Sequence, residues 1–321
     1  MPEVQMPLFD ETEELTAEPP AEPSLREWSY SRRSLLEQCP RRYYYAYYGA
    51  NSRTAKNEPQ KEKLRFLKEL QTRHLRTGNI LHLVIRTYFK HQGKGEVWSV
   101  ERARSWAQKL FRQDVAYSQS YQHGTPHLTG NQRPALLLEF YYGEGGTEAL
   151  MAESEAQLMT AVTNFATSPT LARFREGGYQ AEARVEKWVR KKEAHFTLRG
   201  TVDLTYRDGS HVVIVDWKLG SAGDSGDSLQ LLSYAWWAMD EFKCSPDCIT
   251  LQQVHLSDDS VSSSDVGQKD LMRVEARILQ DLERMQEADK YGRRGLVEVF
   301  TPCAQPRICA LCPFQEICPK E

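Results

Sequence analysis

The period of the hydrophobic pattern changes about halfway along the chain. In the first half, apolar residues recur three and four positions apart, as at Ile80, Leu81, Val84 and Ile85, which predicts a helix over 78–90. The stretch 97–175 is also predicted to be mostly helical, with a polar loop near 118–134. From residue 179 onward, apolar and polar positions alternate, which is typical of strands.

The second half mixes predicted strands with predicted helices. Strands are expected over 179–189, 197–206, 211–218 and 249–256, and helices over 229–242 and 270–290. Helices around a small sheet indicate an α/β domain with one hydrophobic core. We expect a single domain over 26–321, with a helical part over about 26–175, a catalytic sheet over about 176–260, and a C-terminal helix and cysteine-rich tail over 261–321.

The first 25 residues differ in composition from the rest of the chain. They hold seven acidic side chains and no Lys or Arg, and they are poor in apolar groups, so we expect them to be disordered. The chain contains no run of 18 apolar residues, which argues against a membrane span. Its acidic start does not resemble a secretory signal, so we expect a cytoplasmic protein.

Charge is unevenly distributed along the chain. The formal net charge is -3, but without the acidic tail the remainder holds 41 basic against 37 acidic residues. Arginines are concentrated between residues 26 and 94, where they could form a basic face for phosphates. A solvated helical surface explains the same charges equally well.

The clearest local signal is a predicted hairpin near residue 208. The dipeptide Asp208-Gly209 separates two strand-like runs, and Asp-Gly is a frequent two-residue turn between antiparallel strands. If these two residues form the loop, Arg207 pairs with Ser210 and the pairing continues outward from there. A four-residue loop keeps the same parity, whereas a three-residue loop reverses it.

This hairpin determines where its charged side chains point. Counting outward, Asp203 lies opposite Ile214, and alternation places Asp203, Asp216 and Lys218 on one face, with Trp217 on the other. Asp203 and Asp216 become diagonal neighbours, roughly 7–8 Å apart. Two such carboxylates can share a divalent cation that activates water for phosphodiester hydrolysis, and a lysine beside them can offset developing negative charge. A solvent-facing hairpin with merely exposed charges is the alternative.

The order of the motifs resembles the PD-(D/E)XK superfamily in its RecB-like and CRISPR-associated exonuclease branch. The resemblance rests on Gly200-x-x-Asp203, Asp216-Trp217-Lys218, Gln230-x-x-x-Tyr234 and, upstream, Gly78-x-x-x-His82. It spans about residues 29–318. It implies a restriction-endonuclease-like core, in which a small mixed β-sheet is flanked by helices, with a helical insertion and a C-terminal cysteine-rich, cluster-binding tail.

The resemblance also implies roles for individual residues at the predicted metal site. By position, His82, Asp203 and Asp216 look like ligands of Mg²⁺ or Mn²⁺, and the carbonyl of Trp217 looks like a further ligand. Lys218 corresponds to the catalytic lysine of the family. A hydrogen-bonded core histidine is the alternative explanation for His82.

Two further features of the family motif concern DNA contact and an early acid. Gln230 and Tyr234 lie four residues apart on one predicted helix face, and they resemble the motif that contacts DNA near the active site. An ordinary helix surface is the alternative for this pair. The early acidic residue of the family matches either Glu182 or Glu186, and the sequence does not distinguish them.

Seven cysteines in a chain without an export signal favour metal or cluster ligation over disulfides. Cys309, Cys312 and Cys318 are closely spaced near the C-terminus. A fourth ligand could be Cys303, which would complete a local four-cysteine site suited to zinc. It could instead be Cys39, which lies 270 residues before Cys309.

The family resemblance favours Cys39 as the fourth ligand. RecB-like nucleases that carry an iron–sulfur cluster place one cysteine near the start and three at the end, and Cys39 lies in a matching Cys-Pro-Arg-Arg-Tyr context. The resemblance therefore implies a structural [4Fe–4S] cluster on Cys39, Cys309, Cys312 and Cys318. Zinc binding and free thiols are the alternatives, and Cys303 departs from the family pattern.

The acidic tail contains a short candidate binding peptide. The segment Gln5-Met6-Pro7-Leu8-Phe9 resembles the bacterial sliding-clamp-binding pentapeptide, in which apolar side chains fill a pocket on the clamp. Such a segment orders on binding, which keeps its affinity modest. A chance match in a tail of this composition is the alternative.

Taken with the resemblance, these motifs imply a metal-dependent DNA nuclease, an exonuclease on single-stranded DNA in DNA repair, recombination or CRISPR adaptation and defence. The chain lacks helicase motifs, so any helicase or CRISPR adaptation partner is a separate protein. The first alternative is a catalytically silent DNA-binding or assembly subunit of the same fold. The second is a zinc-stabilised interaction protein without a DNA role.

Overall fold

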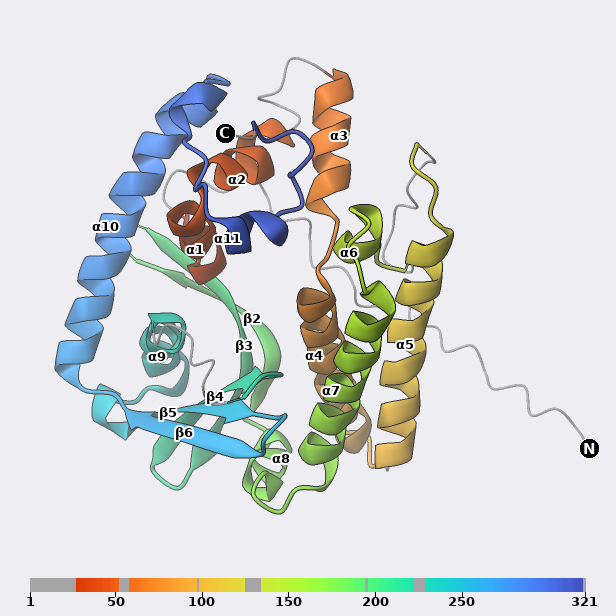
Figure 1. Cartoon of the computed structure of the whole chain (residues 1–321). Helices are drawn as coiled ribbons and strands as arrows, with labels where there is room; N and C mark the ends of the chain where they lie inside the picture. The colour runs from red at the N-terminus through yellow and green to blue at the C-terminus, as the bar shows by residue number, and fades with distance from the viewer. Residues whose placement is uncertain are drawn as a thin grey trace, which may run out of the picture.

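The protein contains a six-stranded mixed sheet that is flanked by helices (Figure 1). The computed structural model describes residues 27–51, 58–96, 98–124, 134–193, 196–221 and 229–319. The predicted disordered tail over 1–25 and its clamp-binding segment over 5–9 lie outside the described residues. Within the described residues, no helix has the length and apolar character needed to cross a membrane.

The sheet combines antiparallel and parallel pairs. Its strands are β1 (Glu27–Trp28), β2 (Arg184–Lys192), β3 (Thr197–Asp208), β4 (His211–Lys218), β5 (Ile249–His255) and β6 (Ser260–Asp265). Their order is β1-β3-β4-β5-β6, and β2 also pairs with β3. The β2–β3, β3–β4 and β5–β6 pairs are antiparallel, whereas β1–β3 and β4–β5 are parallel. The long strand β3 therefore joins the parts of the sheet.

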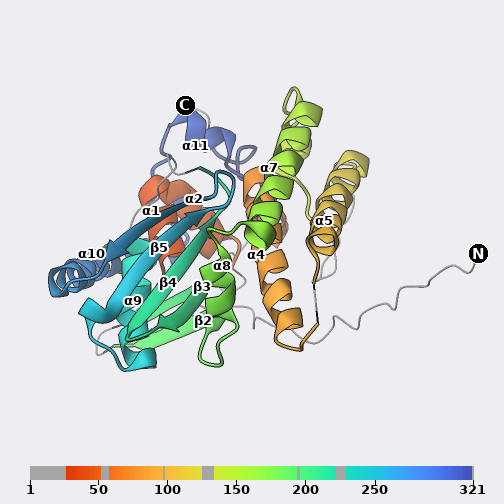
Figure 2. The same cartoon turned by 90° about the horizontal axis from the view of Figure 1, so that it is seen from below.

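Helices cover the sheet on both sides. The first group along the chain comprises α1 (Tyr30–Gln38), α2 (Pro40–Tyr44), the π-helical turn η2 (Tyr45–Gly49), α3 (Glu58–Lys68), α4 (Arg73–Gln92), α5 (Val100–Ser120), α6 (Leu138–Tyr141), α7 (Thr147–Thr167) and α8 (Ala172–Gly178). The second group comprises α9 (Leu229–Phe242), η4 (Pro246–Cys248), α10 (Gln268–Gly292), η5 (Val297–Val299) and α11 (Pro306–Ala310). In both views α4, α5 and α7 lie side by side, and α9 packs on the other side of the sheet (Figures 1 and 2).

The two faces of the sheet contribute to different hydrophobic cores, so the prediction of one core was wrong. Leu204, Val215 and Trp217 pack with α4, α5, α7 and α8. Val202 and Ile214 instead pack with α9. Burial of apolar side chains on both faces is the main stabilising contribution for such a layered arrangement.

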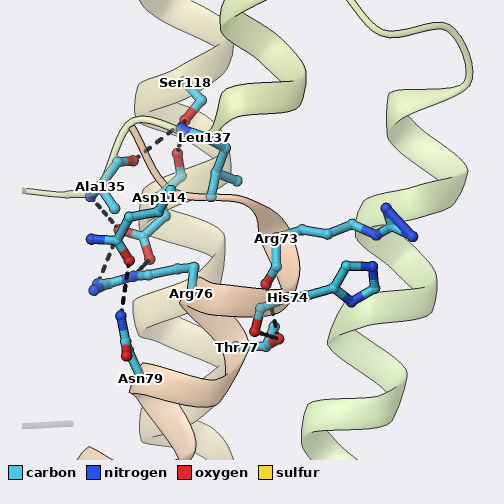
Figure 3. A network of polar contacts seen from close by, with 10 residues as sticks. Arg73, His74, Arg76, Thr77, Asn79, Asp114, Ser118, Ala135 and Leu137 are labelled. Atoms are coloured by element: carbon cyan, nitrogen blue, oxygen red, sulfur yellow. Dashed lines mark hydrogen bonds and ion pairs between the residues drawn. The ribbon is translucent and has the colours of Figure 1, made fainter. Parts of the chain in front are cut away.

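A buried carboxylate anchors α4, the helix that carries His82. Asp114 of α5 accepts hydrogen bonds from Arg76 Nε at 2.6 Å and from the Ala135 backbone N–H at 2.7 Å (Figure 3). Ser118, one turn later on α5, accepts a bond from the Leu137 N–H at 2.9 Å. Because these contacts tie α4 to α5 and to the segment before α6, the position of His82 depends on a satisfied buried network.

Strand β1 and the N-terminal helices are held against α10 near the end of the chain. Trp28 Nε1 donates to Asp281 Oδ2 at 3.2 Å, and the Tyr48 hydroxyl donates to Asp289. Asp289 also lies 3.5 Å from an Arg32 guanidinium nitrogen. Buried charge pairs of this kind fix relative orientation. Here they bring the region of Cys39 to the same end of the molecule as the C-terminal tail (Figure 1).

The mixed α/β fold class predicted from the sequence is the one observed. The helix predicted over 229–242 matches α9, and the strand predicted over 211–218 matches β4. The strand predicted over 179–189 is wrong at its start, because Tyr179 caps α8 and β2 begins at Arg184. Strands β1 and β6 were not predicted, since β1 has two residues and β6 is a polar edge strand of serines and acids.

Candidate active site

The β3–β4 hairpin has a different loop from the one that the sequence predicted. Asp208 pairs with His211, so the loop is Gly209-Ser210 and not Asp208-Gly209, and the predicted pairing of Arg207 with Ser210 is wrong. Gly209 has a φ of 60°, and glycine at the first position is preferred in a two-residue hairpin turn that needs a positive φ there. The observed register is therefore shifted by two residues.

A shift of two residues preserves the faces of the side chains. Leu204 pairs with Val215, so the preceding residue, Asp203, lies opposite Asp216 and not opposite Ile214. Asp203 Oδ2 accepts a hydrogen bond from the Trp217 backbone N–H at 2.8 Å. Both carboxylates are buried, which is costly for charged groups unless they are paired or bind a cation.

Lys218 and Trp217 occupy the positions that alternation requires. Lys218 Nζ lies 2.7 Å from Asp216 Oδ2. The Trp217 indole points to the opposite face, where its ring packs edge-on against Phe165 and Phe174. The Trp217 carbonyl, in β4 between Asp216 and Lys218, stays a predicted ligand.

Glu186 joins the site at an irregularity in strand β2. The β2–β3 pairing runs through Val185–Leu204 and Lys187–Val202 and omits the position of Glu186 opposite Asp203. Glu186 has a φ of 45°, a left-handed conformation that is unusual for a residue other than glycine. Such strain is tolerated where the surrounding structure enforces it, often at functional sites.

The structure distinguishes the two candidates for the early acidic residue. Glu182 is exposed and lies 3.1 Å from Arg207 Nε, away from the other acids. Glu186 is largely buried, and its Oε1 lies 2.8 Å from His82 Nδ1. Glu186 is therefore the member of this pair that belongs to the acidic cluster. It reaches the cluster where the β2 ladder is interrupted, which the sequence pattern does not indicate.

His82 reaches the acids from helix α4. Its Nδ1 lies 2.8 Å from Glu186 Oε1 and 3.6 Å from Asp203 Oδ1. These three residues can each supply one ligand atom within 4.8 Å of the others, a spacing that suits a shared metal ion. One nitrogen and carboxylate oxygens form a donor set that binds divalent transition metals as well as Mg²⁺.

The electrostatics of the cluster favour the binding of a cation. Burial opposes charging of His82, but the carboxylates of Asp203, Glu186 and Asp216 raise its pKa to about 9. Burial raises the pKa of Asp203 to about 8. The neighbouring carboxylates add to this increase, whereas His82 opposes it. Several buried acids close together repel one another, and a bound divalent cation would relieve that repulsion.

Gln230 and Tyr234 lie beside the acids on helix α9. Gln230 Nε2 is 3.3 Å from the Tyr234 hydroxyl. Burial raises the pKa of Tyr234 to about 12, and Asp203 and Asp216 contribute in the same direction. The structure thus brings the predicted Gln/Tyr pair next to the predicted metal ligands.

Gly200 provides the space for Tyr234. A Cβ at Gly200 would lie 2.6 Å from Tyr234 Cε1 and 3.0 Å from its hydroxyl oxygen, too close for any side chain. The glycine of the Gly-x-x-Asp motif is therefore needed for close approach of α9 to β3.

Replacing Gly200 with alanine is expected to lower the free energy of unfolding by about 1–3 kcal/mol, because the added methyl group must displace the buried Tyr234 ring. Chemical denaturation measures this change. Gly145→Ala is the matched control, since nothing lies within 4 Å of its added Cβ. Equal stability of the two variants would show that Tyr234 moves aside without cost.

The C-terminal cysteines lie close to Cys39. The tail packs on α2 and η2 (Figure 1), where the Tyr45 hydroxyl donates to the Ile317 carbonyl at 3.3 Å. Burial, together with the nearby thiols of Cys39 and Cys318, raises the pKa of Cys312 to about 11. Cys39 and the tail are far apart in the sequence but lie close together in the fold.

Cys303 also lies near this group. Its Sγ is 3.9 Å from Cys309 Sγ. Burial raises the pKa of Cys318, and Cys39, Cys309 and Cys303 all contribute in the same direction. Both candidates for a fourth ligand are therefore close to the three C-terminal cysteines.

A mixed sheet flanked by helices, with clustered acids and a lysine on one hairpin, defines a restriction-endonuclease-like fold. The chain belongs to the PD-(D/E)XK nuclease superfamily, whose family model matches residues 27–319. Nucleases of this superfamily are metal-dependent phosphodiesterases that use divalent ions such as Mg²⁺ or Mn²⁺.

Comparison with individual proteins gives weaker similarity. Among solved structures, the crystal structure of SSO0001 is similar at 14% identity, with a TM-score of 0.30, over 74% of this chain and 94% of that chain. A search of curated proteins finds no match.

Proposed function

We propose that this protein is a divalent-metal-dependent deoxyribonuclease of the RecB-like branch, which degrades single-stranded DNA from an end and carries a [4Fe–4S] cluster. The observation that carries the proposal is the convergence of His82 and Glu186 on Asp203, directly beside the Asp216–Lys218 pair. Membership of the superfamily supports the metal-dependent hydrolysis. The preference for single-stranded DNA rests on the resemblance of the histidine-bearing motif.

The buried acids would hold the metal. Asp203, Asp216 and Glu186 supply carboxylate oxygens and His82 supplies a ring nitrogen, with the Trp217 carbonyl as a further donor. When bound, a divalent cation polarises a phosphoryl oxygen and lowers the pKa of a coordinated water.

Lys218 would orient the attacking water and offset the developing negative charge. The carboxylate of Asp216 fixes its ammonium group at 2.7 Å. A cation held beside the reacting phosphate stabilises negative charge that grows in the transition state. Gln230 and Tyr234, which lie beside these groups on α9, would contact the DNA backbone and orient the scissile linkage.

The choice of the cluster over zinc rests on the family resemblance. Within the described chain, no three of the cysteine sulfurs lie within 4.8 Å of one another. A tetrahedral zinc site with Zn–S bonds of about 2.3 Å places its sulfurs roughly 3.8 Å apart. Cys303 Sγ and Cys309 Sγ, at 3.9 Å, have the spacing of a zinc pair, so sulfur distances alone do not select the [4Fe–4S] cluster on Cys39, Cys309, Cys312 and Cys318.

Digestion of end-labelled DNA tests the proposed function. With Mn²⁺ or Mg²⁺, we expect the protein to shorten single-stranded DNA stepwise and to act more slowly on a blunt duplex of the same sequence. Chelation of the divalent ion should abolish cleavage. A protein that binds DNA but leaves it intact with every divalent ion would support the alternative of a catalytically silent subunit.

A further inference from the structure

The β2–β3 ribbon changes face at the active site. Val185 packs against the helical layer of α4 and α7, whereas Val189, four residues later in the same strand, packs against α9. Leu204 and Val202 on β3 are divided between the same two cores. Residues four apart in a regular strand share a face, so both strands reverse their faces where Glu186 meets Asp203.

Beyond this reversal, one face of the ribbon turns away from α9. Val189 and Lys191 point toward α9, where Lys191 Nζ donates to the Trp236 carbonyl at 3.1 Å. The alternate residues Trp188, Arg190 and Lys192 therefore occupy the opposite face, and all three are exposed. On β3, Thr201 pairs with Trp188 and Arg199 pairs with Arg190 on the same face.

Trp188 is unusually exposed for its size. Its side chain has a relative exposure of 54%, and its indole lies 5.7 Å from the Arg199 guanidinium. Arg199 also pairs with Glu27 of β1, which fixes the guanidinium over one face of the ring. The ring is thus held in place from one side while its outer face stays open. An open aromatic face among cations is the arrangement on which proteins stack single-stranded bases.

The charge on this face matches a phosphate backbone. Arg190, Lys192 and Arg199 lie on the same face as Trp188, and Glu27 is paired with Arg199. Within the described part of the chain, neither Arg190 nor Lys192 forms an ion pair. Trp188 lies two residues from Glu186, which is roughly 7 Å along a strand. The cationic face therefore begins directly beside the acids.

We propose that this face, defined by Trp188, Arg190, Lys192 and Arg199, guides single-stranded DNA into the active site, and that Trp188 stacks on a base next to the scissile linkage. Arg190 and Lys192 contact the phosphates that follow. Because a base inside a duplex cannot offer its flat face to an indole, stacking on Trp188 selects unpaired DNA. The inference rests on the proposed nuclease function and assigns its choice of substrate to particular residues.

Abasic substitution in the DNA tests the proposal on the full-length protein. Binding of a single-stranded oligonucleotide is measured without added divalent metal, so that no cleavage occurs, and one abasic site is moved along the strand. For wild type, we expect one position to weaken binding by roughly 5- to 100-fold. Trp188→Ala should bind the intact strand as weakly as wild type binds the strand with the abasic site at that position. The abasic site should not weaken binding by Trp188→Ala any further. Trp188→Phe should retain most of the affinity.

Steady-state cleavage gives a second readout. Trp188→Ala should raise KM for single-stranded DNA by a similar factor with kcat nearly unchanged, and its activity on a blunt duplex should change little. Arg273→Ala, which removes an exposed arginine on α10 outside the proposed face, is the control for general charge loss. Unchanged single-strand binding by Trp188→Ala, or an abasic profile identical to that of wild type, would overturn the proposal.

The two assays separate this inference from the nuclease assignment. If wild type cleaves DNA with metal but Trp188→Ala behaves like wild type, the DNA path is wrong and the nuclease assignment stands. If no metal supports cleavage but the abasic profile depends on Trp188, the DNA path stands and the nuclease assignment is wrong.

Discussion

Replacing Asp216 with asparagine, or Lys218 with alanine, is expected to lower the rate of DNA cleavage by on the order of 10²–10³-fold or more. Asparagine keeps the shape of Asp216 but removes the charge that would hold a divalent cation and that fixes Lys218 Nζ at 2.7 Å. Alanine at position 218 removes the cation that offsets charge in the transition state. Single-turnover cleavage of end-labelled single-stranded DNA measures the chemical step directly.

DNA binding should survive both substitutions, because the proposed binding face lies on β2 and the early part of β3. Asp208→Asn is the matched control, since it removes an exposed carboxylate from the end of β3 in the same hairpin. We expect this control to cleave at the wild-type rate. Full activity in both Asp216→Asn and Lys218→Ala would refute the site, whatever the stability of the variants.

The sequence predicted the faces of the hairpin but not its register. Alternation places Asp203, Asp216 and Lys218 together for any shift by two residues, so the prediction survived a wrong loop. The loop itself depends on which residue adopts a positive φ, and Gly209 takes the first position of the turn. A dipeptide rule cannot distinguish these two placements of the same glycine.

Glu186 shows what local patterns cannot supply. It lies in an ordinary run of charged residues, and its contact with His82 depends on a left-handed residue that interrupts the β2 ladder. That contact joins residues separated by 104 positions. The face reversal next to Glu186, which also exposes Trp188, follows from the packing of α4 and α9 on the two sides of β2 and has no sequence signal of its own.

The cysteine group, unlike Glu186, could be predicted from the sequence. Their spacing and the resemblance together indicated a ligand group, and the packing of the tail on α2 brings Cys39 close to it. The sequence left Cys303 and Cys39 as alternatives, and proximity alone does not choose between them, since Cys303 lies 3.9 Å from Cys309. A substitution experiment that treats the two cysteines separately makes the choice.

Cys39→Ser is expected to remove the iron–sulfur cluster and to lower the free energy of unfolding by about 4–5 kcal/mol. A cluster that links Cys39 to the tail closes a loop of nearly the whole domain. In the chain-entropy model, closure of a 100-residue loop contributes about 4.7 kcal/mol, and greater length adds slowly. Iron and sulfide content and the visible absorption of anaerobically purified protein measure the cluster, and thermal unfolding measures the stability.

Serine at position 39 separates loss of the cluster from local damage. The Cys39 sulfur accepts a hydrogen bond from the Arg42 backbone N–H at 3.4 Å and so caps α2. Serine is among the preferred N-cap residues, so this helix start should be preserved. Destabilisation of Cys39→Ser therefore reports the missing link to the tail and not a weakened helix.

Parallel substitutions identify the fourth ligand. Cys244→Ser, a half-buried cysteine that packs with the α9 core, is the control and should keep both iron and stability. Cys303→Ser should also keep the cluster if Cys39 is the fourth ligand. The reverse result, with iron retained in Cys39→Ser and lost in Cys303→Ser, would place the whole ligand set in the tail. The cluster would then not link the tail to Cys39, and it could no longer stabilise the domain by closing that loop.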